Sequence, residues 1–209
     1  ESTRPGHVQI GDEEEIRRVV PVIEALKKRF DVPVSIDTYK SAVAKAALSA
    51  GADLLNDIWG FRYDERCAKL AAEYDVCLMH NRETMEYNDF MDDVKKDLEI
   101  SLSLAEKYGV KKEKIMLDPG VGFAKTREQN LTIINRLEEI RAMGYPVLLG
   151  TSRKSVIGLT LDLPVDEREE GTIATSVIGA MKGCEFFRVH DVQKNVRALR
   201  MTDAIRREN

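Results

Sequence analysis

Polar clusters follow short apolar runs at six places along the chain. They hold carboxylates, an amide, hydroxyls and basic groups, and they are Asp37, Asn56-Asp57, Met79-His80, Asp118, Ser152-Arg153-Lys154 and Arg188-Val189-His190. The carboxylates and the amide suit a planar heterocycle with several N–H donors, which a carboxylate can bind bidentately. The arginine, histidine and hydroxyl groups suit a phosphate or diphosphate, as do Thr3 and Arg4 near the start of the chain. The residue types therefore predict a site for one polar heterocycle and one anion.

The most informative stretch runs from Lys114 to Lys125, K-I-M-L-D-P-G-V-G-F-A-K. Its apolar run is too short for a helix and is stopped by D-P-G, which predicts a buried parallel strand that ends in Asp118. The glycines that follow allow a tight turn or a close approach of a ligand, and Phe123 adds an aromatic face. Thr126 and Gln129 predict a capping box that opens the next helix. Recurrence of this pattern at other strands weighs against an aspartate that only caps its own turn.

Several polar residues have a plainer interpretation. Asp57 is expected to cap the turn that follows it, and Arg153 to form a structural ion pair or to anchor a loop. His80 is as well explained by a strand-end histidine with satisfied hydrogen bonds as by a site residue. These three residues are therefore the weaker candidates for chemistry.

The elements that position the clusters alternate regularly. Apolar and β-rich runs predict strands over 32–37, 52–57, 76–80, 115–118, 146–149 and 184–190. Helical periodicity predicts helices over 12–30, 41–50, 64–74, 89–108, 128–143, 167–181 and 192–206, the last with Asp191 as its N-cap. Residues two apart on a strand face the same way, which would pair Arg188 with His190, and Ser152 with Lys154 if the fifth strand reaches that far.

Strand-then-helix alternation predicts an α/β fold with a parallel sheet. Polar residues at every strand end favour a closed (β/α)8 TIM barrel, whose loops ring one mouth, over a doubly wound sheet with a single switch point. Six such units are two short of eight. Because the chain opens on a loop-like motif without Met, we expect an incomplete barrel whose first strands lie upstream of Glu1, in one domain over 1–209.

Bulk composition excludes several classes of protein. The net charge is −4 and the basic residues are scattered, which argues against binding to nucleic acid or to a membrane surface. No apolar run approaches the roughly 18 residues that span a bilayer. Cys67, Cys77 and Cys184 lack C-x-x-C spacing and are expected to be buried thiols in a cytoplasmic protein. The three histidines show no zinc-ligand spacing.

The motifs taken together resemble those of the dihydropteroate synthase family. The likeness rests on E-S-T-R-P-G at Glu1, S-I-D-T at Ser35, N-D at Asn56, D-P-G-V-G-F-A-K at Asp118, S-R-K at Ser152 and R-V-H-D at Arg188, in the same order as in the family. This resemblance implies a (β/α)8 transferase of folate biosynthesis and a sulfonamide target. Such enzymes join 6-hydroxymethyl-7,8-dihydropterin diphosphate to p-aminobenzoate and release pyrophosphate and 7,8-dihydropteroate.

The resemblance also implies residue roles. Pterin contacts would come from Asp37, Asn56, Met79, Asp118, Phe123 and Lys154. Contacts with the diphosphate or p-aminobenzoate would come from Thr3, Arg4, Ser152, Arg188 and His190. Catalysis would rest on Asp37, Lys154, Arg188 and His190. The cationic groups would stabilise the departing diphosphate, so no protein nucleophile is required.

One part of the family pattern is absent from this sequence. The family's first loop carries an Asn that helps to bind Mg2+ and an Asp that stabilises the cationic intermediate. We therefore expect Mg2+ as cofactor with no ligand from this chain, and a homodimer through the last helices, where Ala174, Ile178 and Met181 lie.

Three other functions compete with the synthase. The first is a methyltetrahydrofolate-binding domain of corrinoid methyltransferases. Its substrate has no diphosphate, so Arg188 and His190 would have no such anion to bind. A barrel acting on sugar phosphates would leave Asp37, Asn56 and Asp118 unexplained. A catalytically inactive pterin-binding module is the third alternative, because of the absent first loop.

Overall fold

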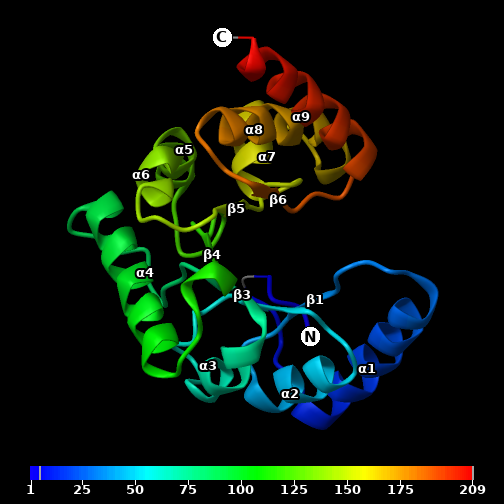
Figure 1. Ribbon diagram of the computed structural model, residues 1–209. Coiled ribbons are helices and arrows are strands. Elements are labelled where there is room, and N and C mark those ends of the chain that lie inside the picture. The colour runs from blue at the N-terminus through cyan, green and yellow to red at the C-terminus, as the bar shows by residue number, and fades with distance from the viewer. Residues whose placement is uncertain (5, 209) are drawn as a thin grey trace. The chain divides into compact units, whose positions relative to one another are not determined.

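The computed structural model describes residues 1–4 and 6–208 (Figure 1). Pro5, which belongs to the E-S-T-R-P-G motif, lies outside the described residues. The chain divides into two compact units. Unit 1 comprises Glu1–Asn81 and Lys96–Met116, and unit 2 comprises Arg82–Lys95 and Leu117–Asn209.

Unit 1 is built on parallel strands. They are β1 (Ser35–Asp37), β2 (Leu54–Asp57), β3 (Asp75–Met79) and the beginning of β4 (Ile115–Asp118), in the sheet order β1-β2-β3-β4. Its helical segments are α1 (Asp12–Arg29), α2 (Ser41–Ser49), α3 (Arg66–Leu70), the 3-10 turns η1 (Ala71–Glu73) and η2 (Lys112–Lys114), and the part of α4 (Phe90–Lys107) from Lys96 onward. Leu55, Val76 and Leu78 are completely buried, as expected for the central strands of a parallel sheet.

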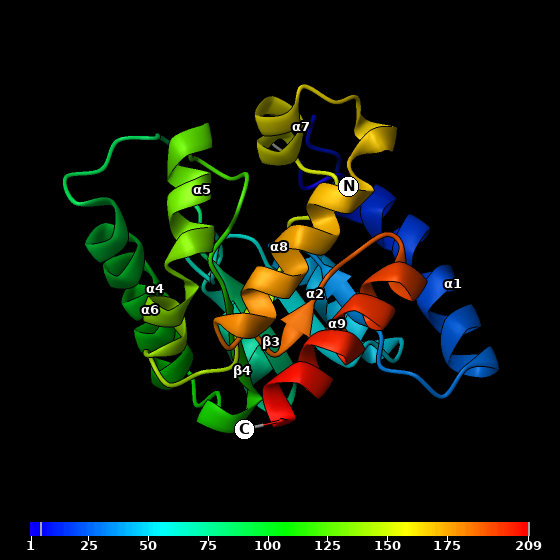
Figure 2. The same cartoon turned by 90° about the horizontal axis from the view of Figure 1, so that it is seen from above.

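Unit 2 contains two short parallel strands, β5 (Leu148–Leu149) and β6 (Phe186–Phe187), and a parallel bridge between Leu117 and Val147. Its helices are α5 (Arg127–Asn135), α6 (Leu137–Arg141), α7 (Ser155–Leu161), the 3-10 turn η3 (Val165–Glu167), α8 (Glu169–Met181) and α9 (Val192–Arg207). Helices α8 and α9 lie side by side (Figure 2), and Ser176 of α8 donates a hydrogen bond to Asn195 of α9.

Most of the predicted elements are present. Strand β4 has the predicted bounds, and the capping box of Thr126 with Gln129 is confirmed, as is the N-cap of Asp191, which accepts from the backbone N–H of Lys194. The three cysteines are buried and free, as expected. The alternating α/β order with parallel strands is confirmed, whereas the incomplete barrel remains a prediction.

Two local predictions were wrong, and one helix was not predicted. The helix over 128–143 is divided into α5 and α6 at Arg136, whose backbone (φ −116°, ψ 28°) leaves the helical region. Helix α7 was not predicted. Strand β6 ends at Phe187, so Arg188 and His190 do not lie on it. Strand β5 ends at Leu149 as predicted, so it does not reach Ser152 and Lys154. The chain turns after Leu149 instead, with Arg153 at φ 56° and Lys154 as the N-cap of α7.

None of the helices in the part of the chain that the structure describes is both long and apolar enough to cross a membrane.

Candidate active site

Unit 1 places three of the predicted residues at the carboxyl ends of neighbouring strands. Asp37 and Asn56 are the register partners at the ends of β1 and β2, and Met79 is the last residue of β3. Register partners in a parallel sheet point to the same face, so Asp37 and Asn56 project side by side. Asn56 and Met79 are buried, and Asp37 is half-buried. A carboxylate, an amide and a thioether thus share one edge of this sheet.

Asp57 points to the other side of β2 from Asn56, and its side chain stabilises the turn that follows the strand. It is completely buried, and its carboxylate accepts hydrogen bonds from the backbone N–H groups of Trp59 (2.8 Å) and Phe61 (3.2 Å). These bonds hold a turn in which Gly60 and Phe61 both have positive φ (56° and 69°). The prediction that Asp57 caps this turn is confirmed.

The loop that carries Thr3 and Arg4 is anchored through Glu1. The Glu1 carboxylate accepts from the backbone N–H of Ile10 (2.7 Å), the hydroxyl of Tyr39 (2.5 Å) and the ammonium of Lys40 (2.7 Å). Although burial acts in the opposite direction, the hydrogen bonds from Lys40 and Tyr39 lower the pKa of Glu1 to about 2. Arg4 is exposed on this anchored loop, where an anion can reach it.

His80 belongs to the packing of unit 1. Its ring is buried, and Nε2 lies 3.0 Å from Oδ2 of Asp97 on α4. The plainer interpretation, a histidine with satisfied hydrogen bonds, is therefore the one that the structure supports.

Unit 2 assembles a carboxylate and two cations around Gly150, which follows β5. A Cβ atom added to Gly150 would lie 3.8 Å from Oδ2 of Asp118, and 4.0 Å from both Nζ of Lys154 and Cβ of Arg188. The bare α-carbon of Gly150 thus faces a space shared by these three residues. Asp118 is only 6% exposed, and this burial raises the pKa of its carboxyl while the charges of Lys154, Lys125 and Arg188 oppose the rise. The sequence analysis missed Gly150, although a glycine directly after a strand was a visible signal.

The loop after Asp118 is held by a second residue that the sequence analysis did not single out. The buried ammonium of Lys125 donates to the carbonyl oxygens of Gly120 and Phe123, both at 3.0 Å. Asp118 itself accepts from the backbone N–H of Gly120 at 2.7 Å. The ring of Phe123 is consequently held 4.9 Å from the ammonium of Lys154, in a cation–π contact.

Ser152 and His190 form a close pair in unit 2. Oγ of Ser152 lies 2.7 Å from Nδ1 of His190 and accepts from the backbone N–H of His190 at 3.1 Å. His190 and Arg188 are exposed, whereas Ser152 is buried. Arg153, next to Ser152, lies 3.6 Å from Glu169 of α8 and forms the structural ion pair that was expected.

The predicted residues thus fall into two groups. Unit 1 holds Thr3, Arg4, Asp37, Asn56 and Met79, and unit 2 holds Asp118, Phe123, Ser152, Lys154, Arg188 and His190. The unit 1 edge offers hydrogen-bond groups for a heterocycle. The unit 2 group combines a carboxylate with positive charge, which suits an anion.

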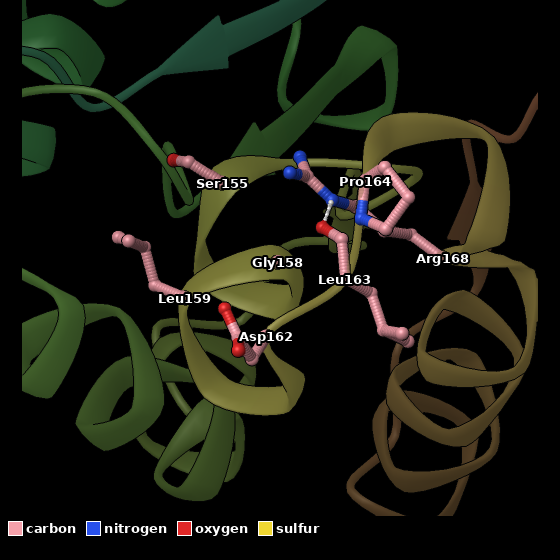
Figure 3. Close-up of a pocket in the computed structure, with 7 residues that line it drawn as sticks. All are labelled: Ser155, Gly158, Leu159, Asp162, Leu163, Pro164 and Arg168. Carbon is pink, nitrogen blue, oxygen red and sulfur yellow. Dashed lines mark hydrogen bonds between the residues drawn. The ribbon is translucent and has the colours of Figure 1, made fainter.

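Unit 2 also has a pocket of about 410 Å³ beside α7 (Figure 3). Its lining residues are Ser155, Gly158, Leu159, Asp162, Leu163, Pro164 and Arg168. The guanidinium of Arg168 donates to the carbonyl oxygens of Leu163 and Arg153, so it serves to join the end of α7 to the turn before it. None of the predicted site residues lines this pocket.

Among the described residues, no three His, Cys, Asp or Glu side chains are grouped so that they could hold a metal ion. Asp118 is already hydrogen-bonded to Gly120 and lies near three cations. These residues do not fit a Mg2+ site, since Mg2+ needs carboxylate or phosphate oxygens that are not already neutralised.

Comparison with known proteins places the chain among pterin-binding enzymes. A family model described as "Pterin binding enzyme" matches residues 1–190. The chain is 60% identical to the dihydropteroate synthase of Clostridium beijerinckii over 208 residues, which is 98% of this chain and 77% of the relative. It is 51% identical to that of Bacillus subtilis over 207 residues, covering 98% of this chain and 73% of the relative.

Solved structures agree with the sequence matches. A dihydropteroate synthase from Clostridium difficile, crystallised in the presence of pteroic acid, has a TM-score of 0.97 and 51% identity, covering all of this chain and 80% of that one. The Yersinia pestis enzyme, in a complex with a sulfonamide drug, has a TM-score of 0.94 and 38% identity, covering all of this chain and 78% of that one. These matches favour the synthase over the methyltransferase alternative.

Proposed function

The chain belongs to the dihydropteroate synthases of the pterin-binding enzyme family, and from this premise we propose how its residues serve the family's reaction. The reaction joins 6-hydroxymethyl-7,8-dihydropterin diphosphate to p-aminobenzoate and yields 7,8-dihydropteroate and pyrophosphate. The fold proposed for it is that of a (β/α)8 barrel, in one domain over 1–209.

The observation that carries the site assignment is the group around Gly150. Asp118 offers a buried carboxylate, and the ammonium of Lys154 and the Cβ of Arg188 lie near the same α-carbon. A pterin presents an amino group and ring N–H groups that a carboxylate can bind as a pair. Asp118 therefore binds the pterin, and Lys154 and Phe123 contact the ring from beside it.

In unit 1, Asp37 and Asn56 supply the matching acceptors and an amide for the pterin, with Met79 as an apolar contact. Asp37 also stabilises the positive charge that develops on the pterin methylene. Thr3 and Arg4, on the loop anchored by Glu1, bind the diphosphate or the carboxylate of p-aminobenzoate.

The chemical step breaks the C–O bond between the pterin methylene and the diphosphate, whose oxygen leaves with the bonding electrons. The amine nitrogen of p-aminobenzoate forms the new C–N bond and releases one proton to water. Arg188 and His190 stabilise the growing negative charge of the leaving group, and the ammonium of Lys154, beside the pterin, adds to this stabilisation. The reaction needs no protein nucleophile.

Mg2+ remains a proposal for this protein. Because the described residues do not fit a Mg2+ site, its ligands would be oxygens of the substrate diphosphate together with a residue that this sequence does not contain.

Ala174, Ile178 and Met181 lie on one face of α8 at helical spacing, and all three are exposed. We propose that this face forms a homodimer interface. A cytoplasmic location is proposed with it, from the three free buried cysteines.

Calorimetric binding of two ligands tests the site. The ligands are 6-hydroxymethyl-dihydropterin and its diphosphate, each measured with and without Mg2+. The diphosphate form should bind more tightly by the worth of a charged hydrogen bond, roughly 1.5 to 3 kcal/mol, or about tenfold to a hundredfold. Arg188→Ala should erase most of this difference and leave the affinity for the alcohol unchanged.

Arg29→Ala is the matched control, because Arg29 is an exposed arginine at the end of α1. It should leave both affinities at their wild-type values. Equal affinity of the wild type for the two ligands would disprove the diphosphate role of Arg188. If neither ligand binds, this chain does not by itself form the proposed pterin site.

A further inference from the structure

Within the described part of the chain, the Ser152 hydroxyl has two polar contacts, both with His190. Its Oγ accepts the backbone N–H of His190 at 3.1 Å and lies 2.7 Å from Nδ1 of the same residue. Ser152 is 9% exposed, whereas the His190 side chain is exposed. The hydroxyl is therefore directed at one edge of the imidazole, and the opposite edge, which carries Nε2, faces away from it.

Counting hydrogens decides the direction of the short contact. If Nδ1–H donated to Oγ, the hydroxyl would accept two N–H groups, and its own hydrogen would have no acceptor among the described residues. If Oγ–H donates to Nδ1, the hydroxyl gives its one hydrogen and accepts one, so each of its contacts is satisfied. The second arrangement requires the neutral ring to carry its hydrogen on Nε2.

We propose that Ser152 is a positioning residue that holds neutral His190 in the Nε2–H tautomer. The exposed edge of the imidazole then presents a hydrogen-bond donor to an anionic oxygen, without needing a positive charge. In this tautomer, Nε2 of neutral His190 already carries a hydrogen. It therefore donates a hydrogen bond to the leaving diphosphate and does not accept the proton of the amine. The inference rests on the proposed function only for the identity of that anion.

Nitrogen NMR of the wild-type protein tests the tautomer directly. The chain has only three histidines, so 15N-histidine labelling gives a simple spectrum in which His190→Gln assigns the signal of interest. Spectra are recorded at rising pH until the ring nitrogen signals no longer move, which is the limit of the neutral rings. Nδ1 of His190 should then resonate as an unprotonated ring nitrogen and Nε2 as a protonated one.

A histidine-containing peptide, measured under the same conditions, gives the reference shifts of protonated and unprotonated ring nitrogens. A His190 signal that matches the Nδ1–H form would overturn the proposal, whatever the protein binds.

Variants separate positioning from direct binding. Ser152→Ala should shift His190 toward a mixture of tautomers and weaken diphosphate binding about tenfold, the loss of one hydrogen bond to a charged group. Ser152→Thr, which keeps the hydroxyl, should restore both. Ser103→Ala, which removes an exposed hydroxyl from α4, should change neither.

The decisive comparison uses His190→Gln as background. If Ser152 acts through His190, adding Ser152→Ala to His190→Gln should cause no further loss of diphosphate affinity. A second loss of the same size would show that Ser152 binds the anion itself and would overturn the positioning role. A wild type with the Nε2–H tautomer and no diphosphate affinity would instead contradict the proposed function.

Discussion

At the scale of the residue, Asp57 makes folding depend on pH. Burial raises its pKa to about 7 from an ordinary 3.8, against the hydrogen bonds from Trp59 and Phe61. Between these two values the folded protein holds a proton that the unfolded chain has lost, so the free energy of unfolding should fall as the pH rises, and level off above about 7. The fall attributable to Asp57 between about pH 5 and pH 8 is about 2 to 3 kcal/mol.

Urea unfolding across this pH range measures the effect. Asp57→Asn has no carboxyl to titrate, so its stability should decline less steeply than that of the wild type, even if the loss of one acceptor lowers it at every pH. Asp31→Asn, at an exposed position, should keep the wild-type slope. Parallel curves for Asp57→Asn and the wild type would show that Asp57 does not titrate in this window.

At the scale of the element, the capping box sets where α5 begins. Oγ1 of Thr126 accepts from the backbone N–H of Gln129 at 3.2 Å, and the Gln129 side chain accepts from the backbone N–H of Thr126 at 2.9 Å. Thr126→Ala should lower the free energy of unfolding by about 1 kcal/mol, measured by urea denaturation. Thr126→Ser should restore most of it. Equal losses in the two variants would mean that the hydroxyl does not stabilise this helix.

At the scale of the whole molecule, the exposed face of α8 predicts self-association. Met181 is 58% exposed on that face. Met181→Glu would place a charge in a buried interface and should raise the dissociation constant of the homodimer about tenfold or more, measured by sedimentation velocity over a range of concentrations. Met85→Glu is the matched control, because Met85 is also 58% exposed but lies in the connection before α4.

Two outcomes would contradict the assignment of this face to the dimer. One is a wild type that remains monomeric at all concentrations. The other is a Met85→Glu variant that dissociates as readily as Met181→Glu, since the effect would then come from added charge alone.

Local patterns determined where most elements lie. Strand β4 and the start of α5 were predicted correctly because their signals are contained in a few neighbouring residues: a short apolar run stopped by D-P-G, and a threonine with a glutamine three residues on. The polar residues at the ends of β1 and β2 were found for the same reason. Alternation along the chain was enough to predict parallel strands.

Tertiary structure decided what depends on partners distant in the sequence. Helix α7 has a sequence of low helix propensity, S-V-I-G-L-T-L, but Gly158 allows the guanidinium of Arg168 to pack against it, where a Cβ would lie 2.2 Å from a guanidinium nitrogen. Strands β5 and β6 pair with each other over two residues, a register that only the folded chain defines.

The same holds for the chemistry of the site. The sequence by itself determined which residue types stand at the strand ends, since that follows from periodicity and turn signals. Only the folded chain brings Ser152 to His190, 38 residues away, and surrounds Gly150 with Asp118, Lys154 and Arg188. Hydrogen-bond direction and burial arise from these long-range contacts, so no local pattern encodes them.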